Sequence, residues 1–452
     1  MKQFKWILTL FVAISSFVVG QEGDAKARVA IIGGGAAGLT STWLLEQDYE
    51  VTLFEQQNRL GGHANTIQVE ADGKTFPIDA GFEFFSDAMF PHFKNLLKIL
   101  NVTTRKYSLT YTFFTADGEE VITLPPVHDG GIEWESFLPG DLFDLIQFGR
   151  FVDAGKKLVA SEDISLTFEQ FVEDYACLTG SFKKDFLYPF IAGAWGDTIE
   201  QTKKFVAYDI LKYCVKNNPG SVVAMKWNEV VGGTSAYIQA LAGQVTRAQI
   251  KLSSQIQSIT YANGVYTITE EGGAISEFDH LVLATNALQA RDLLKDIPET
   301  LDIRSILGQV EYFYTTIAVH GDPTFMPEDQ DDWSVINIKY DGSESSMTVH
   351  KPWRSSIPIF RSWITQDVNK PGFTLPQPLY HVVNYYHPRV NRNYFEAQKA
   401  VEAIQGNRQL WFAGVYTYDV DSHESAILSA ARLAQKLAPN SSRLKQLLTL
   451  EK

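Results

Sequence analysis

The spacing of hydrophobic and polar residues changes several times along the chain, and the change is clearest near its start. Residues 28–32 form a mostly apolar run of the kind found in buried parallel strands. Residues 36–46 then gather their large apolar side chains on one helical face, and residues 50–55 return to a strand pattern. The pattern predicts a compact strand–helix–strand unit.

Strand-rich and helical stretches alternate in large blocks further along the chain. The blocks are, in order, helical patterns over 86–225, strands over 250–285, strands mixed with loops over 305–390, a short apolar strand at 410–413 and an amphipathic helix at 425–437. Strand-rich pieces typical of a nucleotide-binding domain thus occur at three separated places. We therefore expect one discontinuous domain with two insertions.

A glycine-rich loop joins the first strand to the first helix. Gly33, Gly35 and Gly38 form the G-x-G-x-x-G pattern at this junction. Gly33 permits a tight turn, Gly35 lets the backbone approach a pyrophosphate, and Gly38 lets the helix pack closely on the strand. The helix start at Ala36 and Ala37 then presents N–H groups and a positive dipole end to the anion.

A carboxylate stands where such a site needs one. Glu55 ends the second strand, 20 residues after Gly35, where it can accept hydrogen bonds from a ribose 2′-OH and disfavours a 2′-phosphate. The alternative is a glycine-rich turn with an unrelated, solvated Glu55. The chain carries no second G-x-G-x-x-G and no C-x-x-C pair, which disfavours a pyridine-nucleotide disulfide reductase.

The residues that follow Glu55 carry a family resemblance. Arg59-Leu60-Gly61-Gly62-His63 resembles the R-x-G-G-R segment of flavin-containing amine oxidoreductases, a superfamily that includes monoamine oxidases, protoporphyrinogen oxidases and phytoene desaturases. In that family the double glycine lets the backbone lie close to the cofactor, and the arginine contacts it. His63 replaces the second arginine of the pattern.

The resemblance extends along most of the chain. Further segments similar to family motifs are Ile78–Gly81 (D-x-G), Val231–Thr234 (a G-G turn), Leu281–Thr285 (LVLA), Trp411–Gly414 (YFAG) and His423–Ala426 (the start of the helix under the flavin). Val415 replaces the acid that usually follows the last glycine. Within the superfamily, Gly61–Thr66 and Ser422–Glu424 resemble a branch known only as NAD/FAD-binding proteins.

The resemblance implies an α/β fold, in which a discontinuous, Rossmann-like FAD-binding domain of the GR2 type carries an inserted α+β substrate domain. The expected divisions are a signal peptide at 1–20, FAD-binding parts at 27–85, 225–300 and 405–438, a mainly helical substrate-domain insert at 86–224, and a substrate-domain sheet at 301–404.

The implied cofactor is FAD, bound without a covalent link because neither cysteine lies near the C-terminal helix. The residues expected to hold it are Gly33, Gly35, Ala36, Ala37, Gly38, Glu55, Gln56, Arg59, Gly62, His63, Ile256, Gly414, His423, Glu424, Ser425 and Ala426. The helix near Glu424, with Ser422 as its cap, is expected to aim its positive N-terminus at the flavin.

His423 is the candidate catalytic residue, and its alternative is a structural hydrogen-bonding role. If it handles a proton, the helix N-terminus would lower its pKa. The resemblance implies an oxidoreductase that passes a hydride from a small, partly apolar substrate to the flavin, and then to O₂ or an unknown acceptor. Two alternatives stay open: a double-bond isomerase of unsaturated fatty acids, and a noncatalytic flavin-binding module.

Composition excludes several other classes. The chain has 452 residues and a net charge of −14, so nonspecific nucleic-acid binding, which needs a basic face, is disfavoured. Two cysteines exclude a disulfide scaffold and an iron–sulfur protein; Cys177 and Cys214 are expected to be buried thiols or, alternatively, one bridge. His381 and His387 have no third ligand nearby, so no metal is predicted. No G-x-S-x-G elbow supports a hydrolase.

The N-terminus predicts export. A basic start at Lys2 to Lys5 precedes an apolar run over 6–20, shorter than the about 20 residues of a membrane span. Val18 and Gly20 suit a cleavage site, so we expect a secreted or periplasmic protein with no stable membrane span after removal of the signal. The alternative is an uncleaved N-terminal anchor.

Overall fold

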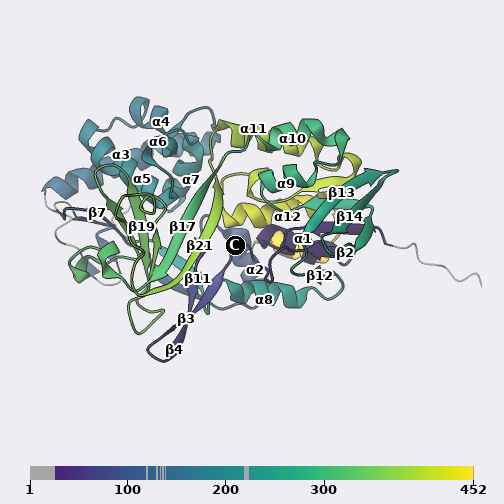
Figure 1. Ribbon diagram of the computed structural model, residues 1–452. Coiled ribbons are helices and arrows are strands. Elements are labelled where there is room, and N and C mark those ends of the chain that lie inside the picture. The colour runs from purple at the N-terminus through teal and green to yellow at the C-terminus, as the bar shows by residue number, and fades with distance from the viewer. Residues whose placement is uncertain are drawn as a thin grey trace, which may run out of the picture.

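The computed structural model describes residues 26–450, apart from 119–120, 129–130, 133, 135–136, 138 and 218–222. Figure 1 shows two halves side by side: one around α1, α12 and β14, which we call the cofactor half, and one around β17, β19 and α3–α7, which we call the substrate half. The predicted signal peptide lies outside the described residues. Within them, no helix is long and apolar enough to cross a membrane.

A parallel sheet of five strands forms the centre of the cofactor half. Its order is β12 (Gln249–Lys251), β2 (Glu50–Phe54), β1 (Arg28–Ile32), β16 (His280–Leu283) and β22 (Leu410–Phe412). β1 pairs in register with β2 on one side and β16 on the other. The sheet thus unites strands from three separated stretches of the chain, and β1 is buried because it lies in the middle.

Two helices pack against this sheet region. α1 (Ala36–Leu45) is buried at every one of its 10 residues, since small side chains and Gly38 let it lie close to the strands. α12 (His423–Leu437) buries one face and runs beside α1 (Figure 1). The three-stranded antiparallel sheet β13 (Ile256–Ala262), β14 (Val265–Glu270) and β15 (Ile275–Phe278) extends the same half.

The substrate half is built on a mixed sheet of seven strands. Its order is β21 (Leu379–Pro388), β17 (Tyr312–His320), β20 (Phe360–Trp363), β19 (Ser345–His350), β18 (Ile336–Tyr340), β7 (Tyr111–Thr115) and β8 (Val121–Leu124). The helices of this half include α3 (Pro139–Ser161), α4 (Phe168–Asp174), α5 (Tyr188–Trp195), α6 (Ile199–Thr202) and α7 (Ala207–Asn217).

Helices predominate over strands in the described part of residues 86–224, as expected, yet strands of this segment also join two of the sheets. This segment also contributes β6 (Thr104–Ser108), β7 and β8, and β7 pairs in parallel with β18, more than 200 residues further along the chain. β6 pairs with β11 (Lys226–Val230), which also pairs with β5 (Phe85–Ser86). These partners are distant in sequence, and tertiary pairing decided the local structure.

The remaining elements join or edge the two halves. They are the hairpin β3 (Thr66–Ala71) and β4 (Lys74–Asp79), the strands β9 (Val127–His128) and β10 (Gly131–Ile132), and the helices α2 (Pro91–Ile99), α8 (Ser235–Gln244), α9 (Ala287–Leu293), α10 (Leu301–Leu307), α11 (Arg392–Ile404) and α13 (Ser442–Leu448). Cys177 and Cys214 are both unpaired; Cys177 is exposed, contrary to the expectation of a buried thiol.

Candidate active site

The glycine loop forms the tight turn that the sequence predicts. Gly33 has a φ of 107°, and a Cβ at this position would lie 2.7 Å from the carbonyl oxygen of Ala284 in β16's following turn. A Cβ on Gly38 would overlap the carbonyl oxygen of Gly33 at 1.8 Å. Both glycines are therefore required for close packing of α1 on the sheet.

Gly35 differs from its neighbours because the space in front of it is open. It is the N-cap of α1 with a φ of −70°, a conformation open to any residue, and the nearest atom to an added Cβ is the Gly62 Cα at 4.0 Å. No side chain caps this helix end, and its first turn holds no acid. A buried helix end without a cap leaves backbone N–H groups that an anion can satisfy.

Glu55 braces this loop. The side chain is 9% exposed, and its two oxygens accept hydrogen bonds from the backbone N–H groups of Gly34 at 2.7 Å and Gln57 at 2.8 Å. Each carboxylate oxygen has a second lone pair, so a ribose hydroxyl can still donate to it. The backbone of Glu55 also accepts from Ser254, which brings the start of β13 at Ile256 to the same edge of the site.

The double glycine after Glu55 lies against the first loop. Gly61 pairs with Gly35 in a parallel bridge and donates its N–H to the Gly34 carbonyl at 2.8 Å. Arg59 folds back and donates to the Gly62 carbonyl at 3.0 Å. The predicted cofactor residues from both loops therefore meet in space, whereas Gln56 is exposed.

His63 connects this cluster to the start of α12. Its carbonyl oxygen accepts from the Phe82 N–H at 2.9 Å, and the Phe82 ring stacks on His423 at 4.0 Å and 5°. His63 is accessible to solvent, although the rings of Tyr385 and His387 and other protein atoms lie close around it. Desolvation first, and then His387, His423 and Arg59, lower its pKa to about 3.

His423 is enclosed by aromatic side chains. Its Nε2 lies 2.6 Å from the Tyr237 hydroxyl, and the Phe93 ring meets it edge-on at 4.8 Å. Burial lowers its pKa to about 3, so the ring is neutral near pH 7. The sequence predicted that the helix N-terminus would lower the pKa of His423; in the structure, the cause of the lower pKa is desolvation. The contacts of His423 favour its alternative role as a structural hydrogen-bonding residue.

The first turn of α12 is closed by its own side chains and those of its neighbours. The Ser422 hydroxyl accepts from the Ser425 N–H at 3.0 Å, which confirms the predicted cap. Glu424 turns away, and its carboxylate accepts from the N–H groups of His92 at 2.9 Å and Phe93 at 2.8 Å. Its side chain thus caps α2 and is not available to a cofactor; only its main chain is.

The other predicted residues of this segment are also buried. Ser425 and Ala426 lie in the first turn of α12, and Gly414, with a φ of 131°, donates its N–H to the Ser429 hydroxyl at 2.9 Å. Gly414 thereby ties the end of β22 to α12.

A cluster of buried charged side chains lies next to the site and joins its segments. Asp79, in the D-x-G segment, accepts from the N–H and hydroxyl of Thr234 at 2.7 and 2.8 Å, and so joins that segment to the G-G turn. Glu83 pairs with Lys351 at 2.8 Å and with Arg361. Burial opposes ionisation of Glu83, but these two cations outweigh it and lower the carboxyl pKa.

Two residues that the sequence did not assign to the site also lie beside His63. Tyr385 lies 4.6 Å from the His63 ring and its hydroxyl accepts from Asn65 at 3.1 Å; His387 lies 5.2 Å from the same ring. The Nδ1 of His387 in turn lies 3.9 Å from the Asp421 carboxylate. Both residues lie on β21 of the substrate sheet, outside the motifs that indicate the cofactor site.

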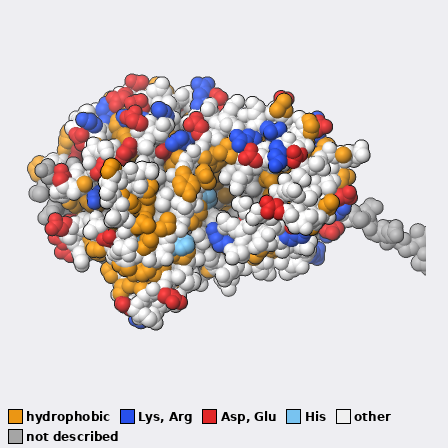
Figure 2. Space-filling model, viewed as in Figure 1, with side chains coloured by type: hydrophobic (Ala, Val, Ile, Leu, Met, Phe, Trp, Pro, Cys, Tyr) orange, Lys and Arg blue, Asp and Glu red, His pale blue; other side chains and the backbone are white. Residues whose placement is uncertain are grey.

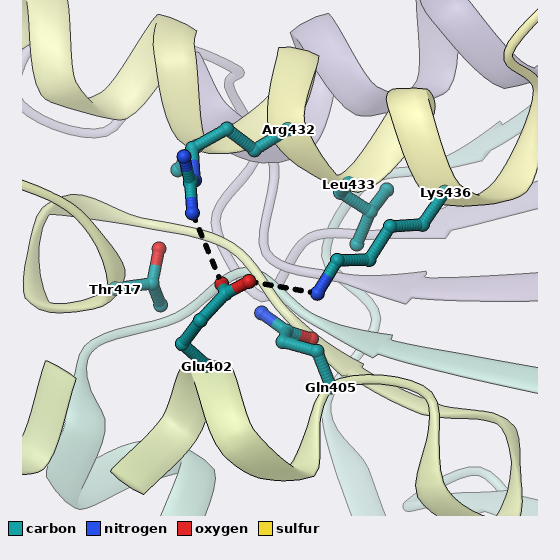
Figure 3. A pocket seen from close by; sticks show the side chains of 7 residues that line it. Glu402, Gln405, Thr417, Arg432, Leu433 and Lys436 are labelled. Atoms are coloured by element: carbon teal, nitrogen blue, oxygen red, sulfur yellow. Dashed lines mark hydrogen bonds and ion pairs between the residues drawn. The ribbon is translucent and has the colours of Figure 1, made fainter. Parts of the chain in front are cut away.

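A separate pocket lies between α11 and α12 (Figure 3). Its charged side chains pair among themselves: Glu402 contacts Arg432 at 3.3 Å and Lys436 at 2.9 Å. Both cations are thus already paired with the same carboxylate, and we assign no ligand to this pocket. Among the described residues, no group of three or more metal-ligating side chains occurs.

The site residues fit a bound dinucleotide. The uncapped N-terminus of α1, the open space in front of Gly35 and the braced carboxylate of Glu55 match a pyrophosphate and a ribose in type and order. Together with the parallel sheet, they define the class of the protein: a dinucleotide-binding α/β protein that carries a second, attached domain.

Comparison with known proteins gives the family. Residues 36–320 match the family model described as flavin containing amine oxidoreductase, and the chain belongs to that family. Over 40 residues, 8% of this chain, it is 52% identical to the protoporphyrinogen oxidase of Saccharomyces cerevisiae. Such matches to curated relatives span only 7% to 14% of the relatives' own lengths.

Solved structures share the fold over nearly the whole chain. A fatty acid isomerase from P. acnes, described as CLA-producing, has a TM-score of 0.68 at 16% identity, over 91% of this chain and 99% of its own. Cyclohexylamine oxidase from Brevibacterium oxydans has a TM-score of 0.62 at 17% identity, over 91% and 99%. These likenesses confirm the predicted α/β fold, and the family confirms FAD as the cofactor.

Proposed function

We propose that this protein oxidises a small, partly apolar substrate by hydride transfer to bound FAD. The observation that carries the proposal is the surface between the two halves. Figure 2 shows it hollowed beside β17 and β21, with hydrophobic side chains along its margin and histidine side chains within view. The exposed ring of His63, in the segment assigned to the cofactor, supports the same location for the substrate.

The side chains that cluster around His63 and the ends of β17 and β21 suit an apolar substrate with one polar group. Phe313 and Tyr385 are mostly buried and offer aromatic surface, while His63 and His387 offer ring nitrogens. When bound, the flavin supplies the hydride-accepting ring; the protein orients the substrate and excludes water. The reoxidant is O₂ or another acceptor.

The test is anaerobic mixing of the purified holoprotein with a panel of four probes: cyclohexylamine, putrescine, linoleic acid and β-carotene. Loss of the flavin absorbance band with one probe supports oxidation and names the substrate class. Absence of bleaching with every probe, together with unchanged probes in the product mixture, contradicts the proposed oxidation of these classes.

A second candidate is a redox-neutral isomerase of unsaturated fatty acids. Its support is the fold that the chain shares with the fatty acid isomerase, which has a higher TM-score than cyclohexylamine oxidase. The same experiment separates the two functions. An isomerase converts linoleic acid into a conjugated isomer while the flavin spectrum returns to its oxidised form without any acceptor.

A further inference from the structure

His387 and Asp421 form a pair at the junction of the two halves. His387 is at the end of β21 in the substrate sheet, and Asp421 stands two residues before α12 of the cofactor half. The His387 Nδ1 lies 3.9 Å from the Asp421 carboxylate, and the two side chains are 31% and 27% exposed. They are mostly covered, yet a small molecule can reach them. Such pairs are often loose without substrate and tighten when it binds.

The pair faces the segment assigned to the cofactor. The His387 ring lies 5.2 Å from the His63 ring, which belongs to the double-glycine loop beside the N-terminus of α1. On its other side, His387 packs against Phe313 at 5.8 Å, and the guanidinium of Arg389 lies over the same Phe313 ring. Arg389 is itself paired with Asp197 at 2.8 Å.

Asp421 is held in place through its main chain. Its N–H donates to Asp209 at 3.2 Å, and its carbonyl accepts from the Tyr213 hydroxyl at 2.9 Å; both partners belong to α7. Within the part of the chain that the structure describes, the imidazole of His387 is the basic side chain that lies beside the Asp421 carboxylate, at 3.9 Å. The nearby Asp419 is instead paired with Lys212 at 2.5 Å.

The other groups near Asp421 do not compete for this role. Asp209 is fully buried, and burial, with Asp421 and Asp419 nearby, raises its carboxyl pKa to about 7 even though Trp195 donates to it. The remaining titratable neighbours are the phenols Tyr213, Tyr312 and Tyr394, from α7, β17 and α11 respectively, whose pKa burial raises. They stay neutral near pH 7.

The two other histidines of the site are poor proton acceptors. The pKa of His63 and of His423 is lowered to about 3, and the Nε2 of His423 is already bonded to Tyr237. A base is most effective when its pKa lies near the working pH. An imidazole with a carboxylate beside one nitrogen keeps its other nitrogen available as an acceptor.

We propose that His387, oriented by Asp421, accepts the proton that the substrate loses on oxidation; this rests on the oxidoreductase function proposed above. The N–H or C–H bond next to the oxidised carbon breaks, and its electron pair forms the new double bond. The proton passes to Nε2 of His387 while Nδ1 faces Asp421. FAD, when bound, would supply the two-electron acceptor for the hydride that leaves the oxidised carbon. Asp421 is a positioning residue.

The first test needs no substrate. In holoprotein with ¹³C-labelled histidine, the His387 ring signal, identified by its loss in His387→Gln, is followed by NMR across pH. Removal of a carboxylate partner disfavours the imidazolium, so Asp421→Asn is expected to move the midpoint of this titration to lower pH. An unmoved midpoint overturns the pair.

The second test measures flavin reduction by whichever probe of the panel bleaches the wild-type flavin. His387→Gln is expected to lower the rate constant about 100-fold or more with FAD content unchanged, as loss of a general base does. Asp421→Asn lowers it by a smaller factor and shifts its pH profile. The control is His381→Gln, an exposed histidine on the same strand, with a wild-type rate.

The outcomes separate the two proposals. Reduction of His387→Gln at a rate within twofold of wild type overturns the role of His387 and leaves the proposed function intact. If no probe bleaches the wild-type flavin, the proposed oxidation fails, and the NMR titration still decides whether His387 and Asp421 act as a pair.

Discussion

Two helix N-termini in the cofactor half are built in opposite ways. α1 begins at a glycine, without a side-chain cap, and the space before it is open. α12 begins at Ser422, which caps it, and its first turn is filled by His423 and Glu424, both bonded to other segments. The difference indicates that α1 is left open for an anion, whereas α12 is closed by the protein itself and acts on a cofactor only through its dipole and its backbone.

The largest expected effect comes from closing the open end. Gly35→Val should abolish FAD binding, because the side chain would fill the space that the pyrophosphate needs. The backbone at Gly35 has ordinary dihedral angles, so the apoprotein should keep its fold. FAD content of the purified variant measures the effect, and circular dichroism measures the fold.

Gly38→Ala is the matched contrast. Here the added Cβ would overlap the Gly33 carbonyl, so the expected loss is in stability rather than in binding alone. If Gly35→Val retains a normal FAD content, α1 is not the pyrophosphate site and the comparison fails.

The next largest effect concerns the closed end. Glu424→Ala should destabilise the fold by about 3 kcal/mol, because two buried N–H groups at the start of α2 lose their acceptor. Chemical denaturation measures the change. Glu402→Ala is the control: its ion pairs lie at the surface and contribute about 0–1 kcal/mol. Equal stabilities of the two variants would contradict the capping role.

Glu55→Ala should weaken FAD by about 1–3 kcal/mol, the cost of a charge-assisted hydrogen bond to the ribose. The variant also loses the brace on the Gly34 N–H, so part of the effect comes through the shape of the loop. Titration of the apoprotein with FAD measures the affinity. Glu50→Ala, at the exposed start of the same strand, should bind FAD as wild type does, and an equal loss in both variants would refute the ribose assignment.

The open end could be predicted from sequence because all its parts are local. The strand at 28–32 and the helix start at Ala36 match the structure, since contiguous residues form the strand, the turn and the helix. The contacts at the start of α12 and the residues of β21 beside His63 could not be predicted so well. Phe82 stacks on His423, and His387 lies beside both His63 and Asp421; these partners come from separate segments, and only the folded chain brings them together. The strands at 104–124 were missed for the same reason.

The smallest expected effect is on the pH dependence of stability. His423 has a pKa of about 3 in the folded state and 6.5 as its ordinary value, so between these pH values the unfolded chain binds a proton that the folded chain does not. Stability is therefore lost as the pH falls through this window, and the residue has no such effect above it.

His423→Phe keeps an aromatic ring against Phe82 but cannot take up the proton. Its stability curve should be shallower than wild type below pH 6.5, by at most about 1.4 kcal/mol per pH unit. Denaturation at pH 4.5, 5.5 and 7.5 measures the slope, and parallel curves for the two proteins would show that His423 is not kept neutral by burial. Because the ring is neutral near pH 7, a pH profile of flavin reduction near neutrality that is the same in His423→Phe and wild type would further separate this closed helix end from the pair at His387.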